Sequence, residues 1–365
     1  MKKIEIKNLV RPHILAMKPY SSARSEYEGN DGIFLDANEN SLGSVCEELH
    51  NRYPDPLQIQ VKEKLAQQEN LQVENIFIGN GSDECIDVLV RAFCEPKEDS
   101  VIVCPPVFSM YEHSAHSQNV KVIEVLLKEN TFQLNTEVIL SLSKNSLSNS
   151  VLRQAQHDNV KILFICSPNN PTGNLIAEND IETILNNFDG IVVVDEAYQD
   201  FSANESWTKR LNEFQNLVVI KTFSKAYGMA DARIGMLYAN EEIVHYMNVI
   251  KLPYNINQHT QTLALEAVNK SETKENFVQE LIHGRKYLEQ ELSQISFIQK
   301  IYPSDANYIL FKVKDANQLY QYLIQQKIIV RNRNSAPLLD GCLRVSVGTK
   351  NENKKFIEAL KNYKS

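Results

Sequence analysis

The feature that most constrains the fold is a series of short Val- and Ile-rich runs that recur between longer segments of helical periodicity. Short apolar runs bounded by turns are typical of strands that helices cover on both faces, as in parallel sheets. The pattern therefore predicts an α/β fold with a mostly parallel sheet covered by helices. The strands expected in this core are 76–79, 101–104, 120–126, 162–166, 191–194, 217–221 and 234–239.

The pattern changes after Pro253, where long polar helices are expected over about 258–294. The strands expected after these helices are 308–313, 328–331 and 343–347. At roughly 150 residues per domain, a chain of 365 residues suggests about two domains. The predicted division is an N-terminal arm with part of the small domain at 1–45, a large α/β domain at 46–255 and a small α+β domain at 256–365.

Composition argues against nucleic-acid binding and against a membrane span. The formal charge of -8 offers no basic field for nucleic acid, and no apolar run approaches the roughly 18 residues of a membrane span. Charges and prolines interrupt the N-terminal segment before a signal-peptide core could form, so a soluble, cytoplasmic protein is expected. The six cysteines show no C-x-x-C spacing, and the pair His113 and His116 lacks a third ligand, so no metal site is predicted.

Polar residues capable of catalysis or ligand binding follow several of the expected strands. Lys225 comes shortly after the run LVVI, Asp195 directly follows IVVV with Tyr198 three residues later, and Asn170 lies in the turn CSPNNPTG after ILFIC. Ligands of open α/β sheets bind at the carboxyl ends of the strands. A fourth strand ends in GNGSDE, where Ser82 and Asp83 open a helix whose free N–H groups favour an anion.

Each of these signals alone has an ordinary structural explanation. Most lysines are solvated, an aspartate can cap a helix, Asn-Pro marks common turns, and a glycine-containing turn before a helix is often a plain N-cap. Together they place an amine, a carboxylate, an amide and an anion cradle at one edge of one sheet. That combination is what carries the functional interpretation.

The combination resembles the fold type I pyridoxal phosphate (PLP) enzymes of the aminotransferase family. The segment from Ser224 to Gly235, S-K-x-x-G-x-x-x-x-R-x-G, is a specific match. The resemblance implies that Lys225 is the Schiff-base lysine and catalytic residue. It also implies cofactor-binding roles for Ser82, Asp83, Phe108, Asn170, Asp195, Tyr198, Ser224 and Arg233.

Further motifs along nearly the whole chain are similar to the histidinol-phosphate aminotransferase family: LDANEN, RYPDP, CPPVFSMY, VVVDEAY, PYNIN and GCLRVSVGT. The resemblance implies transamination of L-histidinol phosphate with 2-oxoglutarate, in histidine biosynthesis. It places Tyr20, Asn38, Arg331 and Arg344 at the substrate. Tyr53 would reach the cofactor phosphate of a neighbouring subunit, which implies a homodimer.

Three departures from the family pattern stand out. Phe108 replaces a more usual tyrosine, Asp231 precedes Arg233 where a small residue is common and is expected to face outward, and Ser141–Ser150 resembles an insertion. The alternatives on the same frame are an aromatic amino acid aminotransferase and a PLP decarboxylase acting on a phosphate substrate. A PLP-binding regulator would need a DNA-binding module, for which the residues before the core are too few.

Overall fold

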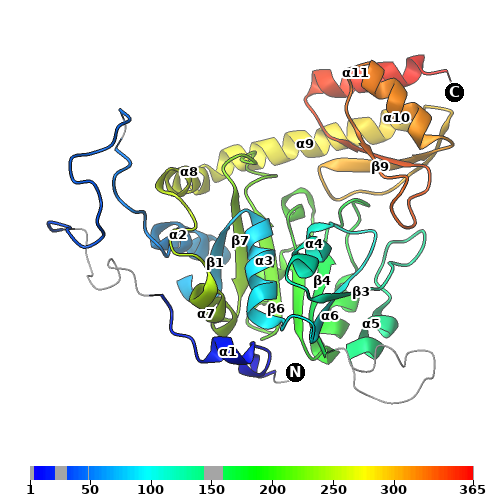
Figure 1. Cartoon of the computed structure of the whole chain (residues 1–365). Coiled ribbons are helices and arrows are strands. Elements are labelled where there is room, and N and C mark those ends of the chain that lie inside the picture. Colours follow the sequence, from blue (N-terminus) through cyan, green and yellow to red (C-terminus); the bar gives the residue numbers. More distant parts are fainter. Residues whose placement is uncertain (1–3, 21–30, 48, 144–158, 365) are drawn as a thin grey trace.

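The computed structural model describes residues 4–20, 31–47, 49–143 and 159–364. Its larger sheet has seven strands in the order β1-β7-β6-β5-β4-β2-β3 (Figure 1). Their bounds are β1 Ile76–Asn80, β2 Asp99–Val103, β3 Lys121–Glu124, β4 Asn159–Cys166, β5 Ile191–Asp195, β6 Leu217–Thr222 and β7 Ile234–Ala239. All neighbouring pairs are parallel except those of β7, which runs antiparallel to β1 and β6. The predicted α/β fold class with a mostly parallel sheet is confirmed.

Helices cover both faces of this sheet because alternate strand residues point to opposite faces. Val192 and Val194 of β5 join one apolar core, and Ile191 and Val193 of the same strand join the other. The first core includes residues of α2, α6 and α8, and the second includes residues of α3, α4 and α7. The helices of this part are α1 Pro12–Leu15, α2 Ile59–Glu69, α3 Ser82–Phe93, α4 Met110–Ser117, α5 Thr136–Ser143, α6 Glu178–Asn187, α7 Glu241–Ile250 and α8 Gln258–Val268.

A second, antiparallel sheet has the order β10-β11-β9-β8 and packs with the long helix α9 and with α10 and α11 (Figure 1). The bounds are α9 Ser271–Leu292, β8 Ile298–Ile301, β9 Tyr308–Val313, α10 Ala316–Gln325, β10 Arg331–Asn332, β11 Cys342–Ser346 and α11 Lys350–Asn362. β8 was not expected, because its four residues include Gln299 and Lys300 and none of them is fully buried. Only Arg331 of the strand expected at 328–331 is in a strand, because β10 consists of Arg331 and Asn332.

Two segments that the predicted division separates from the large domain pack on helices of the large sheet. Ile4, Ile6 and Ile14 are buried in the same core as α3 and α7, so the first part of the arm lies on the large sheet. α8 packs on α2 through Ala264 and Val268, so this helix also belongs with the large sheet. In both cases apolar side chains are buried against a helix that covers the large sheet. The weak hydrophobic periodicity of the N-terminal segment did not indicate this packing. The boundaries at 45/46 and 255/256 remain predictions.

The described residues offer neither a membrane-spanning helix nor a metal-binding cluster. None of the helices in the described ranges has the length and apolar character needed to cross a bilayer. Within the same ranges no group of three or more His, Cys, Asp or Glu side chains is arranged to hold a metal ion. His116 instead lies 3.7 Å from Glu112, one turn earlier on α4.

Candidate active site

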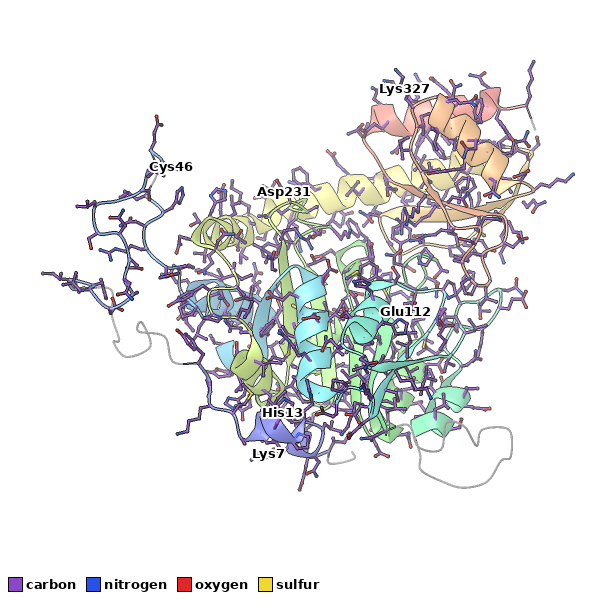
Figure 2. All side chains as sticks on the ribbon, in the orientation of Figure 1. Lys7, His13, Cys46, Glu112, Asp231 and Lys327 are labelled. Carbon is purple, nitrogen blue, oxygen red and sulfur yellow. The ribbon has the colours of Figure 1, made fainter. Side chains whose placement is uncertain are left out.

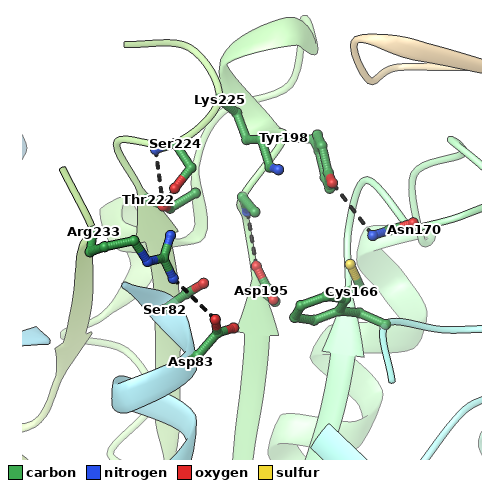
Figure 3. A pocket seen from close by; sticks show the side chains of 12 residues that line it. Ser82, Asp83, Cys166, Asn170, Asp195, Tyr198, Thr222, Ser224, Lys225 and Arg233 are labelled. Atoms are coloured by element: carbon green, nitrogen blue, oxygen red, sulfur yellow. Dashed lines mark hydrogen bonds and ion pairs between the residues drawn. The ribbon is translucent and has the colours of Figure 1, made fainter. Parts of the chain in front are cut away.

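A cavity of about 120 Å³ opens at one edge of the large sheet (Figure 3). It brings together nine residues that the sequence singled out, with three that it did not. The lining residues are Ser82, Asp83, Phe108, Cys166, Asn170, Asp195, Ala197, Tyr198, Thr222, Ser224, Lys225 and Arg233. The cavity therefore unites the amine, carboxylate, amide and anion cradle.

Strand direction explains why these residues meet. β4, β5 and β6 are parallel. Cys166 ends β4 and is in register with Asp195, which ends β5. β7 is antiparallel to both of its neighbours, so β1 runs in the same direction as β6 and also ends at this edge. For the same reason β7 begins there, which places Arg233 beside the helix that follows β1. The antiparallel strand is thus what brings Arg233 to the cavity.

Lys225 lies in the loop between β6 and β7, with its side chain directed into the cavity (Figure 3). Its Nζ atom is 5.6 Å from the ring centroid of Tyr198. Burial and the nearby Arg344 guanidinium lower the pKa of the Lys225 amine, against the opposing effect of Asp195. A larger fraction of this amine is therefore neutral and nucleophilic than in a solvated lysine.

Asp195 ends β5 and is 3% exposed. Its Oδ1 accepts a hydrogen bond from the Ala197 amide at 3.0 Å, and its Oδ2 accepts one from the Tyr111 hydroxyl at 2.5 Å. Burial raises the pKa of this carboxyl, while the two donors act in the opposite direction. Asp195 is thus held by two fixed donors, with Lys225 and the cavity in front of it.

Tyr111 was not predicted as a site residue. It is fully buried on α4, stacks on Phe164 with 4.7 Å between ring centroids, and contacts Phe108 edge to face at 5.6 Å. Its position within the CPPVFSMY motif is the sequence signal that could have identified it, but only packing shows that its hydroxyl reaches Asp195. Tyr111 therefore orients the buried carboxylate.

The anion cradle depends on two glycines. Gly81 has φ +79°, and an added Cβ there would lie 2.4 Å from Arg233 Nη2. A Cβ on Gly235 would lie 2.2 Å from the Ser82 amide nitrogen, so β7 can approach the start of α3 only with glycine at this position. Arg233 Nη2 is 3.1 Å from Asp83 Oδ2. This close approach places a guanidinium against the N-terminus of a twelve-residue helix.

The second sheet reaches the cavity through Asn170. The Arg344 Nη1 of β11 donates to Asn170 Oδ1 at 2.5 Å, and Asn170 Nδ2 lies 3.4 Å from the Tyr198 hydroxyl. The Tyr308 hydroxyl of β9 donates to the carbonyl of Asn169 at 2.7 Å. These bonds fix the side chains of the two sheets against each other at the mouth of the cavity.

Five predicted substrate or interface residues do not line this cavity, and of these Arg344 meets it only through Asn170. Tyr20 and Tyr53 are 66% and 52% exposed, and Tyr53 stacks on Tyr254 at 4.6 Å. Tyr53 and Asn38 line a separate hollow between the arm and α8. Arg331 is exposed on β10, directly opposite Arg344. The roles assigned to all five residues remain predictions.

The other departures have plain structural outcomes. Asp231 is exposed (Figure 2), and the ion pair of Arg233 is made with Asp83. Phe108 lines the cavity as expected, with its edge to Tyr111. The resemblance to an insertion at Ser141–Ser150 falls mostly outside the described residues, since 144–158 are not among them.

Comparison with known proteins agrees with this geometry. Residues 37–360 match the family model described as aminotransferase class I and II. The chain belongs to this family. A relative from Cytophaga hutchinsonii named histidinol-phosphate aminotransferase is 47% identical over 356 residues, which cover 98% of each chain.

Solved structures share the fold of this class I and II aminotransferase. The histidinol-phosphate aminotransferase from Clostridium acetobutylicum aligns with a TM-score of 0.75 at 24% identity, covering 86% of this chain and 90% of that one. The L-threonine-O-3-phosphate decarboxylase from Porphyromonas gingivalis aligns with a TM-score of 0.67 at 21% identity, covering 86% and 90%. The fold alone is therefore shared by a protein named as an aminotransferase and one named as a decarboxylase.

Behind the cavity of this aminotransferase lies a buried charge cluster. Glu196 follows Asp195, is 2% exposed, and accepts hydrogen bonds from the Ser206 hydroxyl and, at 2.7 Å, from the Trp207 amide. Lys221 Nζ is 3.9 Å from Glu196 and 2.7 Å from Glu69. The cluster ties the ends of β5 and β6, which carry the site, to α2.

Burial raises the pKa of Glu196 from 4.5 to about 7. Because the folded-state pKa lies above the unfolded one, the folded protein binds more protons in this window and loses stability as the pH rises through it. We expect the free energy of unfolding of the wild type, relative to that of Glu196→Gln, to fall by up to about 3 kcal/mol between pH 4.5 and 8. Urea unfolding of both proteins across this range measures the difference.

The control for this measurement is Glu129→Gln, which changes an exposed glutamate on a loop. The wild type and Glu129→Gln should give parallel curves of unfolding free energy against pH. Parallel curves for Glu196→Gln as well would show that Glu196 does not titrate in this window.

Proposed function

We propose that this chain transfers an amino group from L-histidinol phosphate to 2-oxoglutarate with PLP as cofactor, giving imidazole acetol phosphate and glutamate in histidine biosynthesis. The single observation that carries the proposal is the cavity in which Lys225, buried Asp195 and the α3 anion cradle face one another. The family membership and the 47% identity to a relative of that name support the substrate.

The residues of the cavity fit PLP. The cradle of α3 amides, Ser224 and Arg233 suits a phosphate, because a helix N-terminus and a guanidinium both favour anions. Asp195 is a buried carboxylate that suits a protonated ring nitrogen. The Phe108 ring offers a stacking face, and Asn170 and Tyr198 offer polar groups for the ring 3-oxygen.

When bound, PLP supplies an electron-withdrawing ring that stabilises negative charge at the reacting carbon of the substrate. Lys225 would anchor the cofactor and then use its released amine to move the proton at that carbon. Asp195 would keep a proton on the ring nitrogen, and Tyr111 would orient the Asp195 carboxylate through its 2.5 Å hydrogen bond. Phe108 covers one side of the cavity and excludes water there.

Arg344 is proposed to bind the anion of each substrate. It reaches the cavity mouth through Asn170, and its guanidinium carbon lies 5.0 Å from the Tyr308 ring centroid. L-histidinol phosphate carries a phosphate and no carboxylate, whereas glutamate carries carboxylates only. A planar guanidinium can pair with either group through two parallel hydrogen bonds.

A cytoplasmic homodimer is proposed as the working form. Support for the dimer comes from the described part of residues 31–57, where Tyr53 and several large apolar side chains are exposed in a single chain. These side chains are Ile33, Leu35, Leu42, Val45 and Leu49. A partner that covers them would also be placed to receive Tyr53 at its cofactor phosphate.

The test is a single half-reaction of the purified PLP form. L-histidinol phosphate, phenylalanine or L-threonine O-3-phosphate is mixed with the protein, and the absorbance of protein-bound PLP is followed together with release of carbon dioxide. We expect rapid conversion to the pyridoxamine form with L-histidinol phosphate and no carbon dioxide. Faster conversion with phenylalanine would favour an aromatic aminotransferase, and carbon dioxide from L-threonine O-3-phosphate would favour a decarboxylase.

A further inference from the structure

Three arginines gather on one face of the second sheet, beside the active site. Arg331 of β10 lies directly opposite Arg344 of β11, and the Arg333 amide continues the ladder by donating to the Cys342 carbonyl at 3.0 Å. Residues two apart in an extended chain share a face, so Arg333 lies on the face of Arg331 and Arg344. Like charges opposite one another destabilise an antiparallel pair. The arrangement therefore has a cost that needs an explanation.

These arginines differ from most others in the described part of the chain in how their charge is balanced. Among the described residues, five arginines lie within 4.0 Å of a carboxylate: Arg11, Arg52, Arg91, Arg210 and Arg233. Arg285 also has no described carboxylate within 4.0 Å, but its Nη1 donates to the Phe201 and Ala306 carbonyls. In the described part of the chain no carboxylate lies within that distance of Arg331, Arg333 or Arg344. The Nε atoms of Arg333 and Arg344 are buried without a hydrogen-bond partner. Arg333 and Arg344 are thus half-buried cations without a carboxylate partner among the residues that the structure describes.

The pairing with β11 places Arg333 on the face that carries Arg344, whose guanidinium reaches Asn170 at the mouth of the cavity. Burial, Arg344 and Arg331 lower the pKa of Arg333 to about 10, and the hydroxyls of Tyr308 and Tyr198 act in the opposite direction. The Tyr308 and Tyr198 rings meet edge to face at 5.1 Å, and Lys225 Nζ lies 5.6 Å from the Tyr198 ring. A substrate held by Lys225 would therefore extend toward the pair Arg333 and Arg344.

We propose that Arg333 is a specificity-determining residue that binds the phosphate of the amino donor together with Arg344. The inference rests on the proposed function and adds a residue that the sequence analysis did not select. A phosphate monoester is close to a dianion with three terminal oxygens, so it can occupy two guanidinium groups, whereas one carboxylate is satisfied by one. Arg333 thus selects for phosphate, and Arg344 serves both substrates.

The main test compares donors with and without phosphate on the PLP-loaded protein. Arg333→Gln should lower the half-reaction efficiency with L-histidinol phosphate by about 10- to 100-fold, the usual effect of a lost charge-assisted hydrogen bond. Efficiency with L-histidinol, which lacks the phosphate, and with glutamate should change by less than about threefold. Arg344→Gln should weaken both L-histidinol phosphate and glutamate, and Arg333→Lys should recover part of the preference for phosphate.

A second readout does not depend on turnover. Isothermal titration calorimetry of inorganic phosphate into the PLP-loaded protein should show about tenfold weaker binding to Arg333→Gln than to the wild type. The thermal unfolding midpoint of Arg333→Gln should equal or exceed that of the wild type, because an unbalanced cation is removed. The matched control Arg285→Gln should lower the midpoint, since Arg285 donates to the Ala306 carbonyl at 2.7 Å.

The outcomes separate the inference from the function on which it rests. Equal losses with L-histidinol phosphate and L-histidinol, or no loss with either, would overturn the role of Arg333, as would unchanged phosphate binding. A wild-type protein that does not convert L-histidinol phosphate would overturn the proposed function itself. Loss confined to the phosphate donor, with stability retained, would establish Arg333 as the phosphate-selecting residue.

Discussion

Replacing Lys225 with alanine is expected to lower the rate of transamination by about ten-thousand-fold or more. The amine is needed twice, as the nucleophile that anchors the cofactor and as the base that moves the substrate proton, and general acid–base catalysis alone contributes up to roughly that factor. The cradle, Asp195 and Phe108 remain in Lys225→Ala. The variant should therefore fold normally and still bind PLP without a covalent link.

Two measurements test this expectation. Half-reaction rates report the chemistry, and equilibrium dialysis with borohydride reduction reports whether PLP is bound and whether it is attached to the protein. The control is Lys62→Ala, because Lys62 is 4% exposed and burial lowers its pKa to about 8, yet it lies by a different hollow. Lys62→Ala should keep its activity within about twofold. Near-normal turnover of Lys225→Ala would refute the assigned role of Lys225.

The second large effect is expected for Asp195→Asn, which should slow the half-reaction by roughly 100- to 1,000-fold, the usual loss for one preorganised electrostatic partner. The amide has nearly the shape of the carboxylate but no charge, so it cannot hold a proton on the ring nitrogen. It also presents an amide N–H toward either Ala197 or Tyr111, both of which are donors. Stability should fall by about 1–3 kcal/mol as one donor loses its acceptor.

Single-turnover rates with glutamate and urea unfolding separate the two effects. The matched control is Asp99→Asn, since Asp99 is also buried and accepts two hydrogen bonds, from the Glu95 amide at 2.7 Å and the Asn159 side chain at 2.8 Å. Asp99 starts β2, at the edge of the sheet opposite the cavity. Asp99→Asn should lose stability while keeping its half-reaction rate. Equal rate losses in both variants would assign the effect of Asp195 to folding alone.

Much of the large sheet could be predicted, because the signal of a strand buried on both faces is local. Each of its seven strands overlaps its predicted run, since a continuous apolar segment such as 191–194 has no stable alternative to burial. Elements with a weak hydrophobic pattern were harder to predict from the sequence. β8 was missed because its short, half-exposed segment lacks that signal. The arm at 4–15 could not be placed because its few apolar residues do not indicate which helices they contact.

The candidate site was predictable where chemistry follows directly from a strand end. Lys225, Asp195, Asn170 and Ser82 are each within a few residues of a strand's carboxyl end, and parallel strands bring such ends to one edge. Tyr111, by contrast, reaches Asp195 only through the packing of α4 on β4. Its residue type and position do not reveal the direction of its hydroxyl.

The α/β frame, the family and the set of groups around Lys225 could be derived from the sequence alone, because they depend on local periodicity and on motifs that occupy a few consecutive residues. The residues that support that set could be identified only from the packing of the folded chain. The direction of β7 brings Arg233 to the cradle, and the register of β10 with β11 places Arg331 against Arg344, with Arg333 next to them. Such contacts join residues distant in sequence, and their geometry is set by the packing of whole elements rather than by any local pattern.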